Sequence, residues 1–419
     1  MTIDLPRLLS DFPLLPGLIK ADYTDFEVEE IPLYPFDGAG THVYFLVEKV
    51  GLSTMQAAGE IAQRLNISRR DIGYAGLKDA RAVTRQWLSA EHVDEDAVRG
   101  LEGARLRVVE VTRHRNKLKL GHLRGNRFLI KVRQTQPDRL AELQDALQTL
   151  VRRGVPNYFG PQRFGSRGDT WMSGRAIVRE QYDEVVDLVL GRPTEHDHGD
   201  IRRARKLYEL GQYAEAARLW PGMFRDERRA LHALAKTNGK KKRAYLAIDE
   251  VTRTFYVSAY QSYLFNRVLA LRLPHGLDRL MLGDLATRHA NDAVFLVEDP
   301  EKEQPRADAF EISPSGPLFG YRTSEPQGEP ARMEAEVLAG EELTREAFRQ
   351  KYLRVKGGRR PLRFAIEDAA AKLGADERGP YLSLAFALPR GCYATAVLRE
   401  LFTAPQAAEE GPHPGEPEP

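Results

Sequence analysis

Residues 40–65, GTHVYFLVEKVGLSTMQAAGEIAQRL, combine two hydrophobic periodicities in one short stretch. In residues 43–47 apolar side chains occupy both alternating positions, which predicts a β-strand that is covered on both faces. Ser53 and Gln56 are spaced as a capping box, and apolar residues recur behind them at helical intervals. The stretch therefore predicts a buried strand followed directly by a capped helix.

More strands and helices are predicted on both sides of this stretch. Alternating apolar residues predict three strands, over residues 82–93, 105–115 and 126–134. Segment 19–32 is expected to lie at a sheet edge, and Pro137 can begin a helix that Gly154 ends. Hairpin-length links join several strands, so this part of the chain is predicted to be α+β with a mostly antiparallel sheet flanked by helices.

The composition and hydrophobic pattern of the sequence change near residue 183, and the earlier pattern returns near the C-terminus. Residues 200–236 and 255–273 have a strongly helical pattern, residues 284–328 are rich in Gly and Pro, and a helix is predicted over 344–353. Residues 381–402 read as a strand, a turn and a helix that resemble the first part. We therefore predict three regions, namely a discontinuous domain (1–182 and 362–404), an inserted domain (183–361) and a disordered, acidic, Pro-rich tail (405–419).

Composition limits the class of protein. The 419 residues are 42% hydrophobic and 29% charged, as in ordinary globular proteins, and no apolar run is long enough to cross a bilayer. Cys392 is the sole cysteine, which excludes an intrachain disulfide and a cysteine-based zinc site and agrees with a reducing compartment. We expect a cytoplasmic protein that has no metal site and no membrane partner.

One block of the sequence is strongly basic although the net charge is only +2. Residues 113–133, which we call the basic block, contain eight Lys or Arg and no Asp or Glu, a composition that suits a polyanion. A single cluster of this kind is more often a solvated face. Three further basic clusters favour a nucleic acid partner, and the predicted RNA-binding residues are Arg113, Arg115, Lys117, Lys119 and Arg124.

Asp79 lies in a Gly-containing turn within GYAGLKDARAVTRQW, residues 73–87. An Asp in such a turn most often caps the turn. Here the nearby cations Lys78, Arg81 and Arg85 are placed to keep a carboxylate ionised beside a flipped base. An ionised, partly desolvated Asp suits nucleophilic or general-base chemistry on a nucleotide.

Other polar and aromatic residues invite a functional interpretation. In GVPNYFGPQRFG, residues 154–165, Asn157 could read the edge of a pyrimidine and neighbouring aromatic residues could stack on bases, although packing is the commoner role. Tyr393 follows a glycine turn and could contact a base or pack. The HDH sequence at 196–198 is more simply explained by solvation than by metal binding.

Four ordered segments resemble the successive motifs of the tRNA pseudouridine synthase D family. They are DFEVEEI (25–31), GYAGLKDARAVTRQW (73–87), GVPNYFGPQRFG (154–165) and LPRGCYATAVLREL (388–401). The resemblance extends from near Lys20 to about Leu401. The middle region is longer than in compact family members, chiefly around 195–243, and it would help to choose the RNA.

The resemblance implies a pseudouridine synthase catalytic core with an inserted TRUD-type domain. It implies an isomerase that converts uridine to pseudouridine in tRNA, typically at position 13 of the D arm, with a flipped base, no cofactor and no obligatory protein partner. On matching positions, the catalytic residue is Asp79. The residues that contact the substrate are Lys20, Phe26, Asn157, Phe159 and Tyr393.

Several alternatives stay open at this point. Asp79 could attack C1′ or C6, or remove a proton from the sugar. A non-catalytic RNA-binding protein, such as an RNA chaperone, would use Asp79 only as a turn residue. A hydrolase of the glycoside-cleaving kind would need a paired acid, and the nearest preceding acid, Asp71, has no motif support.

Overall fold

The computed structural model describes residues 5–403 and 406–407. These residues form two compact units, which we treat separately. The sheet unit contains residues 7–155 and the described residues from 364 onward, whereas the helix-rich unit contains residues 5–6 and 156–363. The sheet unit is thus made of two stretches that flank most of the helix-rich unit along the chain.

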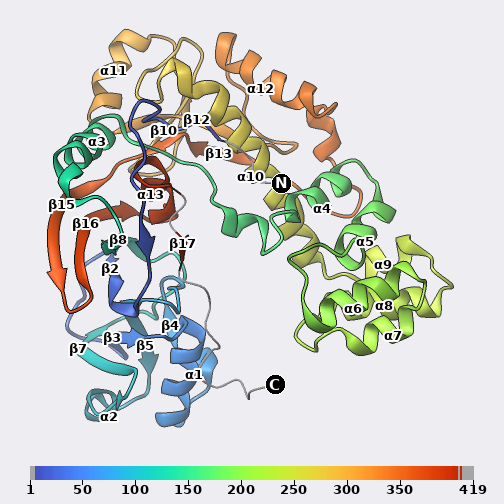
Figure 1. Cartoon of the computed structure of the whole chain (residues 1–419), viewed down its shortest axis with the longest axis horizontal. Coiled ribbons are helices and arrows are strands. Elements are labelled where there is room, and N and C mark those ends of the chain that lie inside the picture. Colours follow the sequence, from blue (N-terminus) through green and yellow to red (C-terminus); the bar gives the residue numbers. More distant parts are fainter. Residues whose placement is uncertain (1–4, 404–405, 408–419) are drawn as a thin grey trace. The chain divides into compact units, whose positions relative to one another are not determined.

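The sheet unit is built on a mixed sheet of nine described strands (Figure 1). Their order is β15, β16, β8, β2, β5, β3, β7 and β6, and β4 pairs with β5. Among these strands only β2 and β5 run parallel, which confirms the predicted α+β class with a mostly antiparallel sheet. The bounds are β2 Phe26–Pro32, β3 His42–Val50, β4 Gly73–Tyr74, β5 Val83–Glu91, β6 Glu102–Gly103, β7 Leu106–His114, β8 Leu123–Val132, β15 Glu367–Asp376 and β16 Gly379–Pro389.

Strand β3 and the helix after it have the predicted structure. Val43 and Phe45 pack in one apolar cluster and Tyr44 packs in another, so the strand is covered on both faces. In α1 (Thr54–Arg64) the Ser53 hydroxyl accepts a hydrogen bond from the Gln56 N–H, and the Gln56 side chain accepts one from the Ser53 N–H. Because this reciprocal cap satisfies two N–H groups, the helix begins at a defined residue directly after the strand.

The remaining helices of the sheet unit cover other parts of its core. Apolar residues of α3 and α13 join those of β2, β8 and β16 in one cluster. A short parallel strand pair lies beside the main sheet. The bounds are β1 Leu18–Ile19, η1 Tyr23–Asp25, η2 Arg69–Asp71, α2 Glu95–Arg99, η3 Pro137–Arg139, α3 Leu140–Arg153, α13 Ala394–Leu401 and β17 Gln406–Ala407.

The helix-rich unit combines helices with a four-stranded antiparallel sheet in the order β11, β10, β12, β13. Strands β9 (Val155–Pro156) and β14 (Arg363–Phe364) lie where the chain passes between units. The other bounds are η4 Pro161–Phe164, α4 Thr170–Val178, α5 Tyr182–Leu190, α6 Gly199–Glu209, α7 Tyr213–Leu219, α8 Arg225–Lys236, α9 Lys241–Ala247, α10 Glu250–Arg272, η5 Leu273–His275, β10 Leu285–Arg288, β11 Val294–Leu296, α11 Pro300–Asp308, β12 Ile312–Leu318, α12 Gly328–Gly340, η6 Arg345–Phe348 and β13 Gly358–Pro361.

Helix α10 organises the core of this unit. It packs closely against α4, where a Cβ atom at Gly174 would collide with the backbone carbonyl of Tyr256. This close packing explains why residues 156–182, which the sequence analysis assigns to the discontinuous domain, lie in the helix-rich unit instead. The chain therefore passes from the sheet unit to the helix-rich unit at residue 156, before the composition and hydrophobic pattern change near residue 183.

Two local predictions are wrong. Segment 344–353 forms only a short 3₁₀ turn, because Arg349 and Arg354 make an isolated antiparallel bridge that closes a tight loop. Strand β2 is an inner strand between β8 and β5, not an edge. At this inner position Glu29 faces arginines on both neighbouring strands, Arg85 at 3.8 Å and Arg127 at 3.7 Å.

Two further features bear on the predictions from sequence. Within the described residues, no helix is both long and apolar enough to cross a membrane. Of the tail 405–419, Gln406–Ala407 form β17, and the predicted disorder otherwise falls outside the described residues.

Candidate active site

Asp79 lies on an exposed turn between β4 and β5. Its side chain is 52% exposed, and the Lys20 ammonium group donates a hydrogen bond to Asp79 Oδ2 over 2.9 Å. Lys20 Nζ also lies 4.3 Å from the centre of the Phe26 ring. Three residues that the family resemblance implies, Lys20, Phe26 and Asp79, are therefore adjacent and place a carboxylate, a cation and an aromatic ring at one position.

The turn that carries Asp79 is held by hydrogen bonds from beneath. The Lys78 N–H donates to Thr54 Oγ1 over 2.9 Å, and the Thr54 hydroxyl donates to Gln86 Oε1 over 2.8 Å. Gln86 Nε2 donates in turn to the Gly76 carbonyl over 3.1 Å. Because Thr54 is the first residue of α1 and Gln86 belongs to β5, the turn is fastened to two regular elements.

Lys78 does not serve as the cation of Asp79, which corrects the prediction from sequence. Its ammonium group donates to Glu30 Oε2 over 2.6 Å, and both side chains are almost fully buried. Burial raises the pKa of Glu30, and the charge of Lys78 acts in the opposite direction. The second predicted cation, Arg85, donates to Glu48 over 2.8 Å.

Lys49 adds a second buried ammonium group near this pair. Its side chain donates to the Leu52 carbonyl over 2.5 Å. Burial and, to a smaller extent, the charge of Lys78 lower the pKa of Lys49 to about 8, while the charge of Asp79 acts in the opposite direction. The Asp79 turn therefore rests on buried charged side chains.

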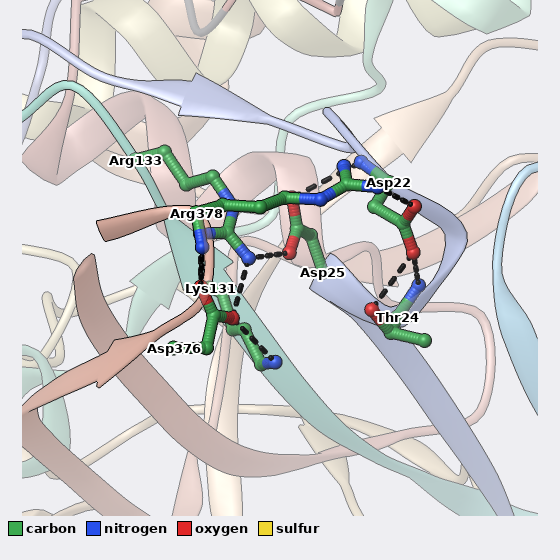
Figure 2. A network of polar contacts seen from close by, with 7 residues as sticks. All are labelled: Asp22, Thr24, Asp25, Lys131, Arg133, Asp376 and Arg378. Carbon is green, nitrogen blue, oxygen red and sulfur yellow. Dashed lines mark hydrogen bonds and ion pairs between the residues drawn. The ribbon is translucent and has the colours of Figure 1, made fainter. Parts of the chain in front are cut away.

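A network of ion pairs anchors the segment between Lys20 and Phe26 (Figure 2). Arg133 donates to both carboxylate oxygens of Asp25, over 2.6 and 2.8 Å, and also to Asp376 over 2.7 and 2.8 Å. Hydrogen bonds from Arg133 hold the pKa of the Asp376 carboxyl well below its usual range. Arg133, directly after β8, and Asp376, at the end of β15, thus fix the position of Asp25, the residue directly before Phe26.

The same network holds the chain directly after Lys20. Asp22 accepts hydrogen bonds from Thr24 over 3.0 Å and 2.8 Å, and Arg378 donates to Asp22 over 2.7 Å. Lys20 itself has a φ of 56°, a left-handed conformation that is uncommon for residues other than glycine. The contacts at Asp22 and Asp25 restrain the chain on the C-terminal side of this unusual residue.

Asn157 and Phe159 form a second group, in the helix-rich unit. Asn157 is buried, donates from Nδ2 to the Pro361 carbonyl over 2.8 Å, and accepts from Arg360 over 2.5 Å. The Arg360 guanidinium lies 4.4 Å from the centre of the Phe159 ring. The backbone N–H and C=O of Phe159 both bond to the Asn266 side chain, each over 2.9 Å. Both ends of the Asn157 amide are thus engaged within this unit.

The family model for tRNA pseudouridine synthase D (TruD) matches residues 2–401 of the chain. The chain belongs to the tRNA pseudouridine synthase D family. A family relative from Geobacter metallireducens is 46% identical over 396 residues, which cover 94% of this chain and 97% of the relative. A relative from Thermus thermophilus is 37% identical and covers 95% of this chain and 92% of its own length. Both relatives are named tRNA pseudouridine synthase D.

A solved structure shares the fold. A crystal structure from Methanosarcina mazei, of a protein assigned to TruD, superposes with a TM-score of 0.83. It is 26% identical in sequence, and the superposition covers 95% of this chain and 96% of that one. The α+β architecture therefore extends to a more distant member of the tRNA pseudouridine synthase D family.

The other family-implied residue, Tyr393, is 44% exposed at the N-cap of α13 in the sheet unit. Two neighbouring aromatic residues of the Asn157 segment, Tyr158 and Phe164, are buried and thus packed against protein. Phe159 is only partly buried. Of the aromatic residues in this segment, Phe159 therefore remains the best candidate for contact with a base.

The predicted RNA-binding residues are largely occupied by contacts inside the protein. Arg113 pairs with Glu95 over 2.5 Å, Arg115 with Asp37 over 3.4 Å, and Arg124 with Glu367 over 2.7 Å. Lys117 donates to the Arg70 carbonyl over 2.6 Å, and Lys119 is exposed. The neighbouring carboxylates reduce the positive potential that the sequence of the basic block suggests.

The HDH sequence has a structural explanation. Asp197 is buried, pairs with Arg205 over 3.0 Å, and accepts a hydrogen bond from the Thr194 N–H over 2.7 Å. Across residues 5–403 and 406–407, no group of three or more His, Cys, Asp or Glu side chains could hold a metal ion. Asp197 therefore stabilises the loop before α6.

Glu30, Lys49 and Arg360 belong to the candidate site but were not predicted from the sequence as site residues. Glu30 lies on the same inward parity of β2 as Phe26 and Val28, which was a usable signal for burial. Lys49 lies near the end of β3, a strand whose apolar residues fill both faces, so its burial was also foreseeable. Arg360 meets Asn157 from a distance of about 200 residues along the chain, and no local pattern predicts that contact.

Proposed function

We propose that the protein isomerises uridine to pseudouridine in tRNA, at position 13 of the D arm, and that Asp79 is the catalytic residue. The observation that carries this assignment is the exposed Asp79 carboxylate, paired with Lys20 beside the Phe26 ring. Membership of the tRNA pseudouridine synthase D family supports the reaction and the tRNA substrate. We place the enzyme in the cytoplasm and expect it to need no cofactor and no obligatory protein partner.

The reaction is a rearrangement within one nucleotide. The bond between uracil N1 and C1′ breaks, the base turns, and C5 bonds to C1′, while C5 loses a proton to water and N1 gains one. The carboxylate of Asp79 takes part as a nucleophile at C1′ or C6, or as the base that removes a sugar proton. The detached uracil has to stay bound throughout, and we assign contact with the base to Phe159 and Tyr393. Phe26 and Asn157 are each 4% exposed, and we assign them the positioning of Lys20 and Arg360.

Lys20 has a positioning role in this proposal. Its ammonium group holds one oxygen of Asp79, so the carboxylate points in one direction before substrate binds. The position of Lys20 depends on the anchored segment shown in Figure 2. Preorganisation of this kind lowers the barrier because the reacting group does not need to be reoriented.

The test uses unmodified tRNA transcripts that carry tritium at uridine C5. Wild-type protein releases tritium to water without an added cofactor, and Asp79→Asn binds the transcript but releases none. A transcript with cytidine at position 13 checks the site, and it releases no tritium if position 13 is the only target. Binding without release by the wild type would instead favour an RNA chaperone.

A further inference from the structure

The helix-rich unit carries an open recess whose lining is strongly basic. Two segments form it, and its volume is about 430 Å³. Its lining consists of Tyr321, Arg322, Arg349, Gln350, Leu353 and Arg354, with three guanidinium groups and no carboxylate. We call this feature the arginine recess.

The backbone of the arginine recess is closely packed. The Tyr321 N–H donates to the Val355 carbonyl over 3.1 Å, and the Arg322 N–H donates to the Lys356 carbonyl over 3.0 Å. A Cβ atom on Gly320 would collide with the backbone of Gly357. The two segments therefore approach each other as closely as glycine permits, and the recess has a defined frame.

Residues of the two recess segments and their neighbours along the chain belong to the core of the helix-rich unit. Phe319 and Phe348 are fully buried, and Leu353 and Val355 are nearly so. Gln350 is tied down because Nε2 donates to the Val178 carbonyl over 3.1 Å. The segments that carry the three arginines of the recess are therefore held in place by the core.

The positive charge of the recess is not compensated locally. Among the residues that the structure describes, Arg322, Arg349 and Arg354 form no ion pair, and all three are exposed. The carboxylates nearby serve other arginines: Arg345 bonds to Glu334 over 3.1 Å and to Glu325 over 3.3 Å. Residues 345–360 contain seven Lys or Arg and a single acid, Glu346.

Three clustered guanidinium groups suit phosphate groups better than other ligands. Each guanidinium offers a planar fork of donors that matches phosphate oxygens. A protein partner would need apolar contact surface, and the only aliphatic lining residue, Leu353, is 4% exposed. The chemistry of the lining therefore selects an anionic, phosphate-bearing ligand.

We infer that the arginine recess binds backbone phosphates of the RNA substrate, in an assignment that rests on the proposed function. It gives the helix-rich unit an RNA-binding surface of its own. The main electrostatic contact with RNA is then made by the arginine recess and not by the basic block, because the arginines of the basic block are paired with carboxylates. Arg322, Arg349 and Arg354 are the contacting residues.

The test compares the triple variant Arg322→Gln/Arg349→Gln/Arg354→Gln with the wild type. Binding of a labelled tRNA transcript is measured over a range of salt concentrations. If three phosphate contacts are lost, the slope of log K against log salt becomes shallower by about 2 to 3. In the tritium-release assay, KM for tRNA rises by about tenfold or more, whereas the change in kcat is smaller.

A matched control separates this effect from a general loss of charge. Arg332 is an exposed arginine of α12 in the same unit, and it pairs with Glu329. Arg332→Gln is expected to leave the salt slope and KM unchanged. A triple variant with the salt slope and KM of the wild type would overturn the inference. Equal effects of the triple variant and of Arg332→Gln would also overturn it.

The outcome is distinguishable from failure of the proposed function. In one outcome the wild type releases no tritium while the triple variant still shows the shallower slope of log K against log salt. That result would overturn the proposed isomerase activity but support RNA binding by the arginine recess. If the triple variant does not fold, wild-type protein is crosslinked to tRNA that contains 4-thiouridine. Crosslinked peptides then include residues 321–323 or 349–354, and their absence would overturn the inference.

Discussion

The surroundings of Asp79 and the basic block place their charges differently. Beneath Asp79, Lys78 and Glu30 form an ion pair in which the side chains are 4% and 1% exposed, whereas Arg115 in the basic block is 80% exposed. Water and salt screen exposed charges but hardly screen buried ones. The difference teaches that buried charges near Asp79 define geometry, while the exposed charges of the basic block, such as Arg115, act weakly and additively.

The largest expected effect on stability is at Glu30. Glu30→Gln leaves the Lys78 ammonium buried without its carboxylate, which destabilises the fold by about 3 to 5 kcal/mol. Urea unfolding measures the change. The matched control is Glu29→Gln on the same strand, because the Glu29 side chain is 42% exposed and its arginine partners lie at 3.7 and 3.8 Å. The control is expected to change stability by less than about 1 kcal/mol.

Equal losses of unfolding free energy in Glu30→Gln and Glu29→Gln would contradict the proposed difference between buried and exposed charges. A second variant sharpens the comparison. Glu30→Leu combined with Lys78→Met removes both charges, so it should destabilise less than the sum of the single changes.

Lys49 should give the sheet unit a pH-dependent stability. The pKa of Lys49 is lowered to about 8 by burial, so in the folded state it loses its proton at lower pH than in the unfolded state. The unfolded state then binds more protons between these pKa values, and stability rises as pH increases from about 8 to about 10.5, by up to ~3 kcal/mol. Lys49→Met should lack this rise, and unfolding of both proteins at several pH values measures it. A parallel rise in the variant would contradict the account.

Lys20 should affect the reaction more than the fold. Lys20→Met removes the hydrogen bond that orients Asp79, and misplacement of a reacting group reduces kcat by about 100-fold. Single-turnover tritium release measures the loss, and urea unfolding checks that stability is retained. Lys20→Arg keeps a cation in place and should recover part of the rate. A Lys20→Met rate within threefold of the wild type would show that the ion pair does not position Asp79.

The smallest effects are expected in the basic block. Lys119→Gln should weaken tRNA binding by no more than about fivefold, equivalent to ~1 kcal/mol, because the side chain is exposed. Arg113→Gln should weaken it less, because Glu95 already pairs with that arginine. Binding titrations at constant salt measure both, and a larger effect at Arg113 would mean that the ion pair opens when RNA binds.

Local patterns predicted much of the fold. The Ser53 cap and the strand around Phe45 follow from short-range rules, and the structure has both. Edge or interior position depends on pairing partners far away in sequence, so no local pattern showed that β2 lies between β8 and β5. The predicted helix over 344–353 failed for a similar reason, because its composition is helical but a bridge between Arg349 and Arg354 closes a loop.

The candidate site was predictable only in part. Family motifs pointed to Asp79, Lys20 and Phe26, and the structure brings these side chains together. The residues adjacent in sequence were a poor guide to charge, since Lys78 turns away to Glu30. Ion pairs between segments far apart in sequence, such as Arg133 with Asp376, arise from the sheet order and have no local signature.

The central claim is that Asp79 is the reacting group of a tRNA pseudouridine synthase. The most direct test measures tritium release from tRNA transcripts labelled at uridine C5, with wild-type protein and Asp79→Asn at equal concentrations of bound RNA. We predict release by the wild type and none by the variant, with tRNA affinity within a factor of about three because the fold and the basic surfaces are unchanged. Release by Asp79→Asn at the wild-type rate would contradict the account.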